Sequence, residues 1–117
     1  MQHVLLVDDE DAILYVFQKY LERGGFAVSA AANAIDAIAI FEAGRVDALV
    51  TDQRMPGMTG DALITHLRAV QPGLPAIIVT AYAAECRPDL DKVTVLNKPV
   101  APAELVAAVE RVLARAN

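Results

Sequence analysis

Acidic, hydroxyl and ammonium side chains stand at the ends of short apolar runs in this sequence of 117 residues. In chain order they are the acidic run Asp8–Asp11, then Asp52, Thr80 and Lys98. A carboxylate such as Asp52 can attack phosphorus in line and become an acyl phosphate. Phosphoryl transfer then needs mainly positioning and neutralisation of the phosphoryl oxygens, which Lys98 and Thr80 could provide. If these groups meet in space, their types favour phosphoryl transfer to an aspartate.

The carboxylates also indicate a metal ion. Asp8, Asp9 and Asp52 in one pocket would repel one another unless a cation lay between them. Hard oxygen ligands suit Mg²⁺, which needs few protein contacts and keeps several of its waters. Such an ion would leave a coordination position for a phosphoryl oxygen, and Lys98 would supply a second, movable positive charge. The pattern therefore predicts Mg²⁺ as the cofactor.

Each of these residues also has a structural explanation when taken alone. Acidic residues favour a helix N-terminus, and Asp52 could belong to the turn at Met55-Pro56-Gly57. Thr80 is an ordinary strand residue, and Lys98 could be an exposed lysine. Their joint placement after separate apolar runs favours the functional interpretation.

The spacing of apolar residues predicts a scaffold that would bring these side chains together. Short apolar runs alternate with segments of helical period, a pattern typical of an α/β fold with a parallel sheet. Right-handed crossovers would give a doubly wound sheet, in which ligands bind at the carboxyl ends of the strands. The predicted strands are Val4–Val7, Ala27–Ala31, Ala48–Val50, Ala76–Val79 and Val93–Leu96.

Helix signals lie between these runs. Asn33 can cap one helix, and Thr59-Gly60-Asp61 opens another, whose apolar stripe is expected to reach Val70. The segment 83–92 is different, because it contains a proline and little apolar period. We expect one or two helical turns there at most.

Composition limits the class of protein. The length fits one domain, residues 1–117, and the net charge of −5 lacks the basic footprint of a nucleic-acid-binding surface. The one cysteine, Cys86, cannot form an internal disulfide and fits a reducing compartment. The N-terminus shows no secretory signal, and no run approaches the roughly 20 apolar residues of a membrane span. We expect a cytoplasmic protein with no direct nucleic-acid contact and no membrane insertion.

Over essentially its whole length the sequence resembles the receiver domains of two-component response regulators. The matching blocks are Val7–Glu10, Asp52–Gly60, Thr80-Ala81 and Lys98-Pro99. The Asp-x-x-Met-Pro-x-Met-x-Gly stretch is a specific signal, and four blocks in order are more specific still. The resemblance implies a flavodoxin-like five-stranded sheet in the order 2-1-3-4-5 with five surrounding helices, of which the fourth would be shortened here.

The resemblance also implies how the metal would be held. Asp9 and Asp52 would bind Mg²⁺ directly, together with the backbone carbonyl of Arg54. Asp8 would act mostly through metal-bound water.

The same resemblance implies roles in signal transduction. Asp52 would accept the phosphoryl group from a histidine kinase or a histidine phosphotransfer protein, and the change would alter protein–protein contacts in a phosphorelay. Lys98 would pair with the phosphoryl group and Thr80 would move toward it, while the Lys98–Pro99 bond is often cis in the family. The chain would catalyse only its own phosphorylation and dephosphorylation.

Three departures from the family pattern carry consequences. Val95 stands three residues before Lys98, where an aromatic residue usually couples to the threonine. The stretch from Thr80 to Lys98 is shorter than usual, which is similar to receivers attached to hybrid histidine kinases and to some stand-alone ones. Arg54 and Tyr82 add bulk beside the expected phosphoryl site, so we hypothesise a longer-lived phosphoryl group.

Other functions share parts of this pattern. An aspartate-based phosphohydrolase also uses a nucleophilic Asp, Mg²⁺, Thr and Lys, but Arg54 occupies the place of its usual second Asp. A flavin-binding module would need a Ser/Thr/Gly-rich loop after the first strand, where the sequence has acids. A receiver-like interaction module that is never phosphorylated remains a third alternative, favoured by Val95 and opposed by the intact Asp9, Asp52 and Lys98.

Overall fold

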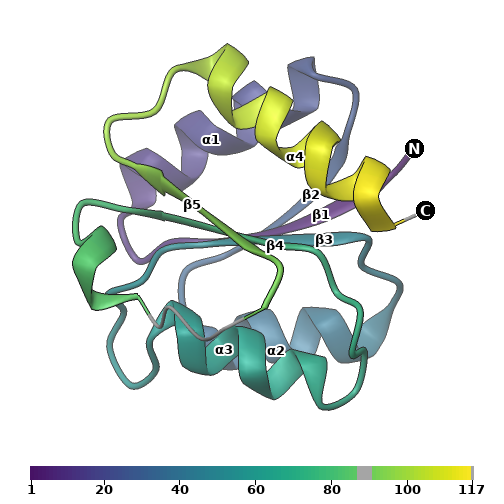
Figure 1. Cartoon of the computed structure of the whole chain (residues 1–117), viewed down its shortest axis with the longest axis vertical. Helices are drawn as coiled ribbons and strands as arrows, with labels where there is room; N and C mark the ends of the chain where they lie inside the picture. The colour runs from purple at the N-terminus through teal and green to yellow at the C-terminus, as the bar shows by residue number, and fades with distance from the viewer. Residues whose placement is uncertain (87–90, 117) are drawn as a thin grey trace.

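The computed structural model describes residues 1–86 and 91–116, which form a parallel sheet between two layers of helices (Figure 1). The sheet has five strands in the order β2-β1-β3-β4-β5, and every pairing is parallel. This confirms the predicted doubly wound α/β fold and its strand order. The strands are β1 (His3–Val7), β2 (Ala27–Ala31), β3 (Ala48–Thr51), β4 (Ala76–Thr80) and β5 (Val93–Asn97).

The helices cover both faces of the sheet. One face carries α1 (Asp11–Arg23) and α4 (Pro102–Ala116), and the other carries α2 (Ala34–Ala43) and α3 (Gly60–Arg68) (Figure 1). Successive residues of a strand point to opposite faces, so β1 supplies Val4 and Leu6 to one core and Leu5 and Val7 to the other. Burial of β1, β3 and β4 on both faces explains why these strands lack polar alternation.

Side chains define where two helices begin. Asn33 Oδ1 accepts a hydrogen bond from the Asp36 N–H at 2.8 Å, and Thr59 Oγ1 accepts one from the Ala62 N–H at 3.2 Å. The expectation that the α3 stripe reaches Val70 is wrong, because the helix ends at Arg68 and Val70 is 74% exposed. The N–H groups of Val70 and Gln71 both donate to Leu67 O, which turns the chain out of the helix.

The fourth crossover differs from the others. After β4 the chain forms a single 3₁₀ turn, η1 (Ala83–Glu85), in agreement with the short helical segment predicted for 83–92; residues 87–90 of that segment lie outside the described residues. The described part of the chain therefore contains four α-helices and one 3₁₀ turn, not the five helices that the resemblance implied. Among the described residues, no helix combines the length and the apolar character that a bilayer crossing requires.

The loop between β3 and α3 depends on two glycines. Gly57 adopts a φ of 84°, which residues with a side chain rarely do. Gly60 N–H donates to Gln53 O at 2.9 Å, and a Cβ at this position would overlap the backbone carbonyl of Asp52. The absence of a side chain at Gly60 lets α3 start directly against the residue that ends the strand.

We predict that Gly60→Ala lowers the free energy of unfolding by about 1–3 kcal/mol, because the added methyl group pushes on rigid backbone. Urea denaturation monitored by circular dichroism measures the loss. Gly44→Ala is the matched control, since its added methyl group meets no atom within 4 Å, and it should change stability by about 0.5 kcal/mol or less. Equal stability of the two variants would contradict the close approach at Gly60.

Candidate functional site

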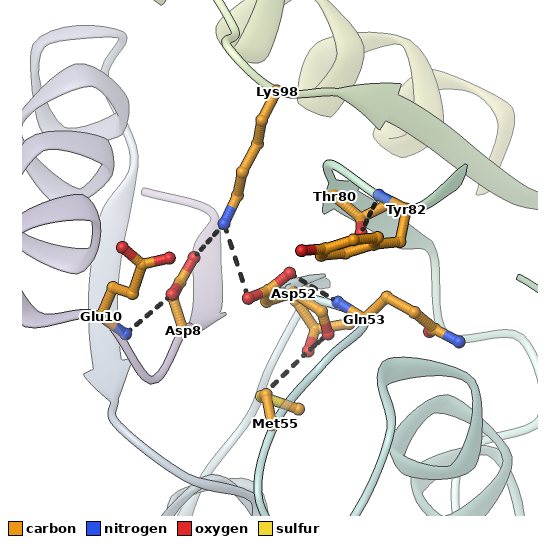
Figure 2. Close-up of polar contacts among 9 residues, drawn as sticks. Asp8, Glu10, Asp52, Gln53, Met55, Thr80, Tyr82 and Lys98 are labelled. Atoms are coloured by element: carbon orange, nitrogen blue, oxygen red, sulfur yellow. Dashed lines mark hydrogen bonds and ion pairs between the residues drawn. The ribbon is translucent and has the colours of Figure 1, made fainter. Parts of the chain in front are cut away.

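Side chains from separate strand ends converge at the carboxyl edge of the sheet (Figure 2). Asp8 directly follows β1, Asp52 follows β3 and Lys98 follows β5. Lys98 Nζ lies 3.0 Å from Asp8 Oδ2 and 3.5 Å from Asp52 Oδ2, so one ammonium contacts both carboxylates. The Lys98–Pro99 peptide bond that follows this lysine is cis.

Asp8, Asp9 and Asp52 form a cluster that could hold a metal ion. Each residue offers one carboxylate oxygen, and these oxygens all lie within 4.8 Å of one another. Asp8 and Asp52 are 2% and 7% exposed, whereas Asp9 is exposed to solvent. Three negative charges face the single positive charge of Lys98, so the donor set fits a hard divalent cation with one open side.

Backbone N–H groups orient the two buried carboxylates. Asp8 Oδ1 accepts a hydrogen bond from the Glu10 N–H at 2.9 Å, and Asp52 Oδ1 accepts one from the Gln53 N–H at 2.8 Å. The second oxygen of each carboxylate faces Lys98. In each carboxylate, one oxygen is therefore held by the backbone that follows it, and the other oxygen points toward Lys98 (Figure 2).

Burial and charge shift the pKa values of Asp52 and Lys98. Burial raises the pKa of Asp52, and the charge of Asp8 raises it further, against the opposing effects of Lys98 and the Gln53 N–H. Burial by itself would lower the pKa of Lys98, but the hydrogen bond and charge of Asp8, with the charge of Asp52, outweigh it and raise the pKa. Lys98 thus stays positively charged while the carboxylates beside it compete for that charge.

Thr80 is fully buried at the end of β4. Its Oγ1 accepts a hydrogen bond from the Tyr82 N–H at 2.9 Å, and Lys98 N–H donates to Thr80 O at 3.0 Å. In Figure 2 the Tyr82 ring points back from this turn toward Asp52. Thr80 is therefore hydrogen bonded both to Lys98, which follows β5, and to Tyr82, which leads into η1.

Arg54 lies at the rim of the site. Its guanidinium carbon is 3.6 Å from the centre of the Tyr82 ring, and its Nε donates to Glu85 Oε1 at 2.8 Å, with Nη2 bound to Glu85 Oε2. Arg54 and Asp9 also line the same open hollow, of about 350 Å³. The Tyr82 ring thus points toward Asp52 (Figure 2), and Arg54 stacks on that ring.

Two residues with contacts in the site were not identified from the sequence. Gln53 is 3% exposed; its Nε2 donates to Asp61 Oδ2 at 2.8 Å and its Oε1 accepts from the Asp61 N–H at 3.0 Å. Glu85 pairs with Arg54 across 31 positions of sequence. The position of Gln53 next to Asp52 was visible in the sequence, but nothing in the sequence indicates a buried amide or a partner so distant.

Comparison with known proteins points to one family. A family model described as the response regulator receiver domain matches residues 4–110. The chain is 37% identical over 105 residues to a response regulator receiver protein of Anaeromyxobacter sp. (strain Fw109-5), covering 86% of this chain and 44% of the relative. It is 35% identical over 116 residues to the sensor kinase CckA of Brucella abortus (strain 2308), covering 94% of this chain and 12% of the relative.

A solved structure shows the same fold. The crystal structure of the receiver domain from the hybrid histidine kinase CckA superposes with a TM-score of 0.83 at 31% identity, covering 95% of this chain and 98% of that one. The chain spans less than half the length of the two curated relatives above.

We predict that Asp52→Asn stabilises the chain in the presence of EDTA near neutral pH. Folding raises the pKa of Asp52, so ionisation of this carboxyl above that pKa costs folding free energy, and the asparagine avoids the cost. The advantage should shrink as the pH falls through the carboxyl range, where Asp52 takes up its proton. Thermal melts of both proteins across pH measure it.

Glu110→Gln provides the control for this experiment, because Glu110 is an exposed acid on α4. It should melt with the wild type at every pH. If Asp52→Asn is less stable than the wild type at neutral pH without metal, burial and the charge of Asp8 do not disfavour the ionised Asp52 as inferred.

Proposed function

Because the chain belongs to the response regulator receiver domain family, we propose that it is a phosphorylation switch in which Asp52 accepts and later loses a phosphoryl group. One observation carries the proposal: Asp8, Asp9 and Asp52 meet Lys98 at one edge of the sheet. We take residues 1–117 as a single receiver domain.

In the proposed reaction, a carboxylate oxygen of Asp52 attacks the phosphorus of a phosphohistidine. An O–P bond forms while the P–N bond breaks, and the departing imidazole nitrogen keeps the bonding electrons and takes up a proton. The protein has mainly to neutralise the equatorial phosphoryl oxygens. Lys98 Nζ lies 3.5 Å from Asp52 Oδ2, which supports its assignment to one of these oxygens, and the Thr80 hydroxyl is assigned to another.

We assign the metal site to Mg²⁺. Asp9, Asp52 and the backbone carbonyl of Arg54 would be direct ligands, and Asp8 would bind through metal-bound water. The clustering of the carboxylate oxygens within 4.8 Å supports this set. When bound, Mg²⁺ would supply positive charge to the phosphoryl oxygens that Lys98 does not reach.

The proposed donor is a histidine kinase or a histidine phosphotransfer protein, and the proposed output is a change in protein–protein contacts. The name of the sensor kinase relative supports a place in such a relay. The net charge of −5 argues against direct nucleic-acid binding. We place the protein in the cytoplasm, without membrane insertion, as a phosphoprotein that catalyses only its own phosphorylation and dephosphorylation.

We predict that acetyl phosphate with Mg²⁺ adds one phosphoryl group to the wild-type chain. The adduct should be absent with EDTA and absent in Asp52→Ala, since the metal neutralises the phosphoryl oxygens and Asp52 is the acceptor. Intact mass of acid-quenched samples measures it. Asp61→Ala is unsuitable as a control because Asp61 anchors Gln53, so Asp36→Ala, an exposed carboxylate on α2, is used instead and should keep the adduct.

Two other results would contradict the proposal. Rapid multiple turnover of phosphate monoesters would indicate a phosphohydrolase. Failure of the wild type to take up a phosphoryl group, with no Mg²⁺ binding, would indicate an interaction module that is never phosphorylated.

We further predict that the double variant Arg54→Ala, Tyr82→Ala shortens the life of the phosphoryl group by roughly twofold to tenfold. The Tyr82 ring points toward Asp52 (Figure 2) and Arg54 stacks on it, so the two side chains together would hinder an attacking water molecule. Decay of the phosphorylated mass after removal of donor measures the lifetime. An unchanged decay rate would show that this bulk does not control access of water.

A further inference from the structure

Every polar group of Glu85 is engaged, and its partners come from the turn and from the loop after Asp52. Its carboxylate accepts two hydrogen bonds from the Arg54 guanidinium, with Arg54 Nε at 2.8 Å from Oε1. Its backbone carbonyl accepts from Gln53 Nε2 at 3.4 Å, and its backbone N–H donates to Tyr82 O at 2.9 Å. Gln53 and Arg54 are the two residues that directly follow Asp52, so the Asp52 loop holds η1 at its last residue.

Arg54 is held between this contact and the candidate metal site. Its guanidinium stacks on the Tyr82 ring, with 3.6 Å between the guanidinium carbon and the ring centre. It also borders the open hollow that Asp9 lines. Because Arg54 follows Asp52 by two residues, an anion on Asp52 would compete with Glu85 for the Arg54 guanidinium.

Phosphorylation would create such an anion. Without it, Lys98 and a bound divalent cation would balance the charges of Asp8, Asp9 and Asp52. An acyl phosphate replaces the single charge of Asp52 by close to two negative charges and leaves an excess of one. Arginine binds phosphate oxygens through charge-assisted, bidentate hydrogen bonds, so the added charge attracts the Arg54 guanidinium.

We propose that the Arg54–Glu85 ion pair is a latch that holds η1 against the Asp52 loop, and that a phosphoryl group on Asp52 draws Arg54 away and releases η1. This proposal rests on the proposed function of Asp52. It supplies a route from the site to the surface after β4 in a chain where Val95 replaces the aromatic residue that usually couples to the threonine.

The strength of the contact fits a switch. The side chains of Arg54 and Glu85 are 54% and 44% exposed, and exposed ion pairs contribute little to stability. A phosphoryl group that favours the open state only modestly can open a weak latch, but it could not separate a deeply buried ion pair.

Cys86 gives a direct readout of the latch. It is the only cysteine of the chain, it follows Glu85, and its N–H donates to Ala83 O at 3.1 Å within the turn. Its side chain is partly buried against the core cluster that contains Leu63 and Ile64. Release of η1 would expose this thiol to a small alkylating reagent.

The experiment treats the full chain with acetyl phosphate, Mg²⁺ and limiting N-ethylmaleimide, followed by an acid quench. Intact mass separates phosphorylated from unphosphorylated molecules in one sample and shows which of them carry the alkyl label. We expect phosphorylated wild type to be labelled roughly twofold to fivefold faster than unphosphorylated wild type. Unphosphorylated Glu85→Gln and Arg54→Ala should already react at the faster rate.

Arg54→Ala is the more stringent variant. Removing this positive charge while Glu85 remains would disfavour the Cys86 thiolate and slow labelling, so a faster reaction can come only from exposure of the thiol. Glu110→Gln makes the same charge change as Glu85→Gln but on distant α4, and it should react like the wild type.

Two results would overturn the latch. Equal labelling of phosphorylated and unphosphorylated wild type would contradict it while leaving phosphorylation of Asp52 intact. Unphosphorylated variants that react at the slow wild-type rate would show that the ion pair does not hold η1. Absence of any phosphoryl adduct would instead reject the proposed function, and the latch with it.

Discussion

Two buried carboxylates share one lysine ammonium at the carboxyl edge of the sheet, and most of the structure serves to maintain that contact. Lys98 approaches Asp8 and Asp52 at 3.0 and 3.5 Å, although the three residues come from three different strand ends. Buried charges are tolerated only when they are paired and hydrogen bonded. Backbone N–H groups at Glu10 and Gln53 supply the remaining hydrogen bonds.

The scaffold keeps this arrangement in place by burying the strands on both faces. Two apolar cores, one under α1 and α4 and the other under α2 and α3, fix the register of the central strands. A one-residue slip of β3 would turn its apolar side chains to the wrong face and move Asp52 away from Lys98. Apolar packing of the strands, rather than attraction among the charged groups themselves, thus holds the charge cluster in position.

The charges of the site are not balanced by its own residues. Three carboxylates face one ammonium, so the site favours added positive charge, and the pKa of Asp52 is raised by burial and by Asp8. Adding or removing a charge on Asp52 changes its electrostatic interaction with the charged groups that border the site. Arg54 is such a group, and in the proposed latch its pairing with Glu85 would link the charge state of Asp52 to the turn after β4.

Local pattern in the sequence determined the strands, the helix starts at Asn33 and Thr59, and the strand-end positions of Asp8, Asp52, Thr80 and Lys98, because burial and capping act over a few neighbouring residues. The short turn after β4 was also predictable, since a segment with a proline and no apolar period cannot sustain a helix. Val70 was misjudged because an apolar stripe does not show where a helix stops. The tertiary structure alone decided that the Gln53 amide reaches Glu85 O and that Arg54 pairs with Glu85. These contacts join residues 32 and 31 positions apart, whose meeting depends on how whole strands pack.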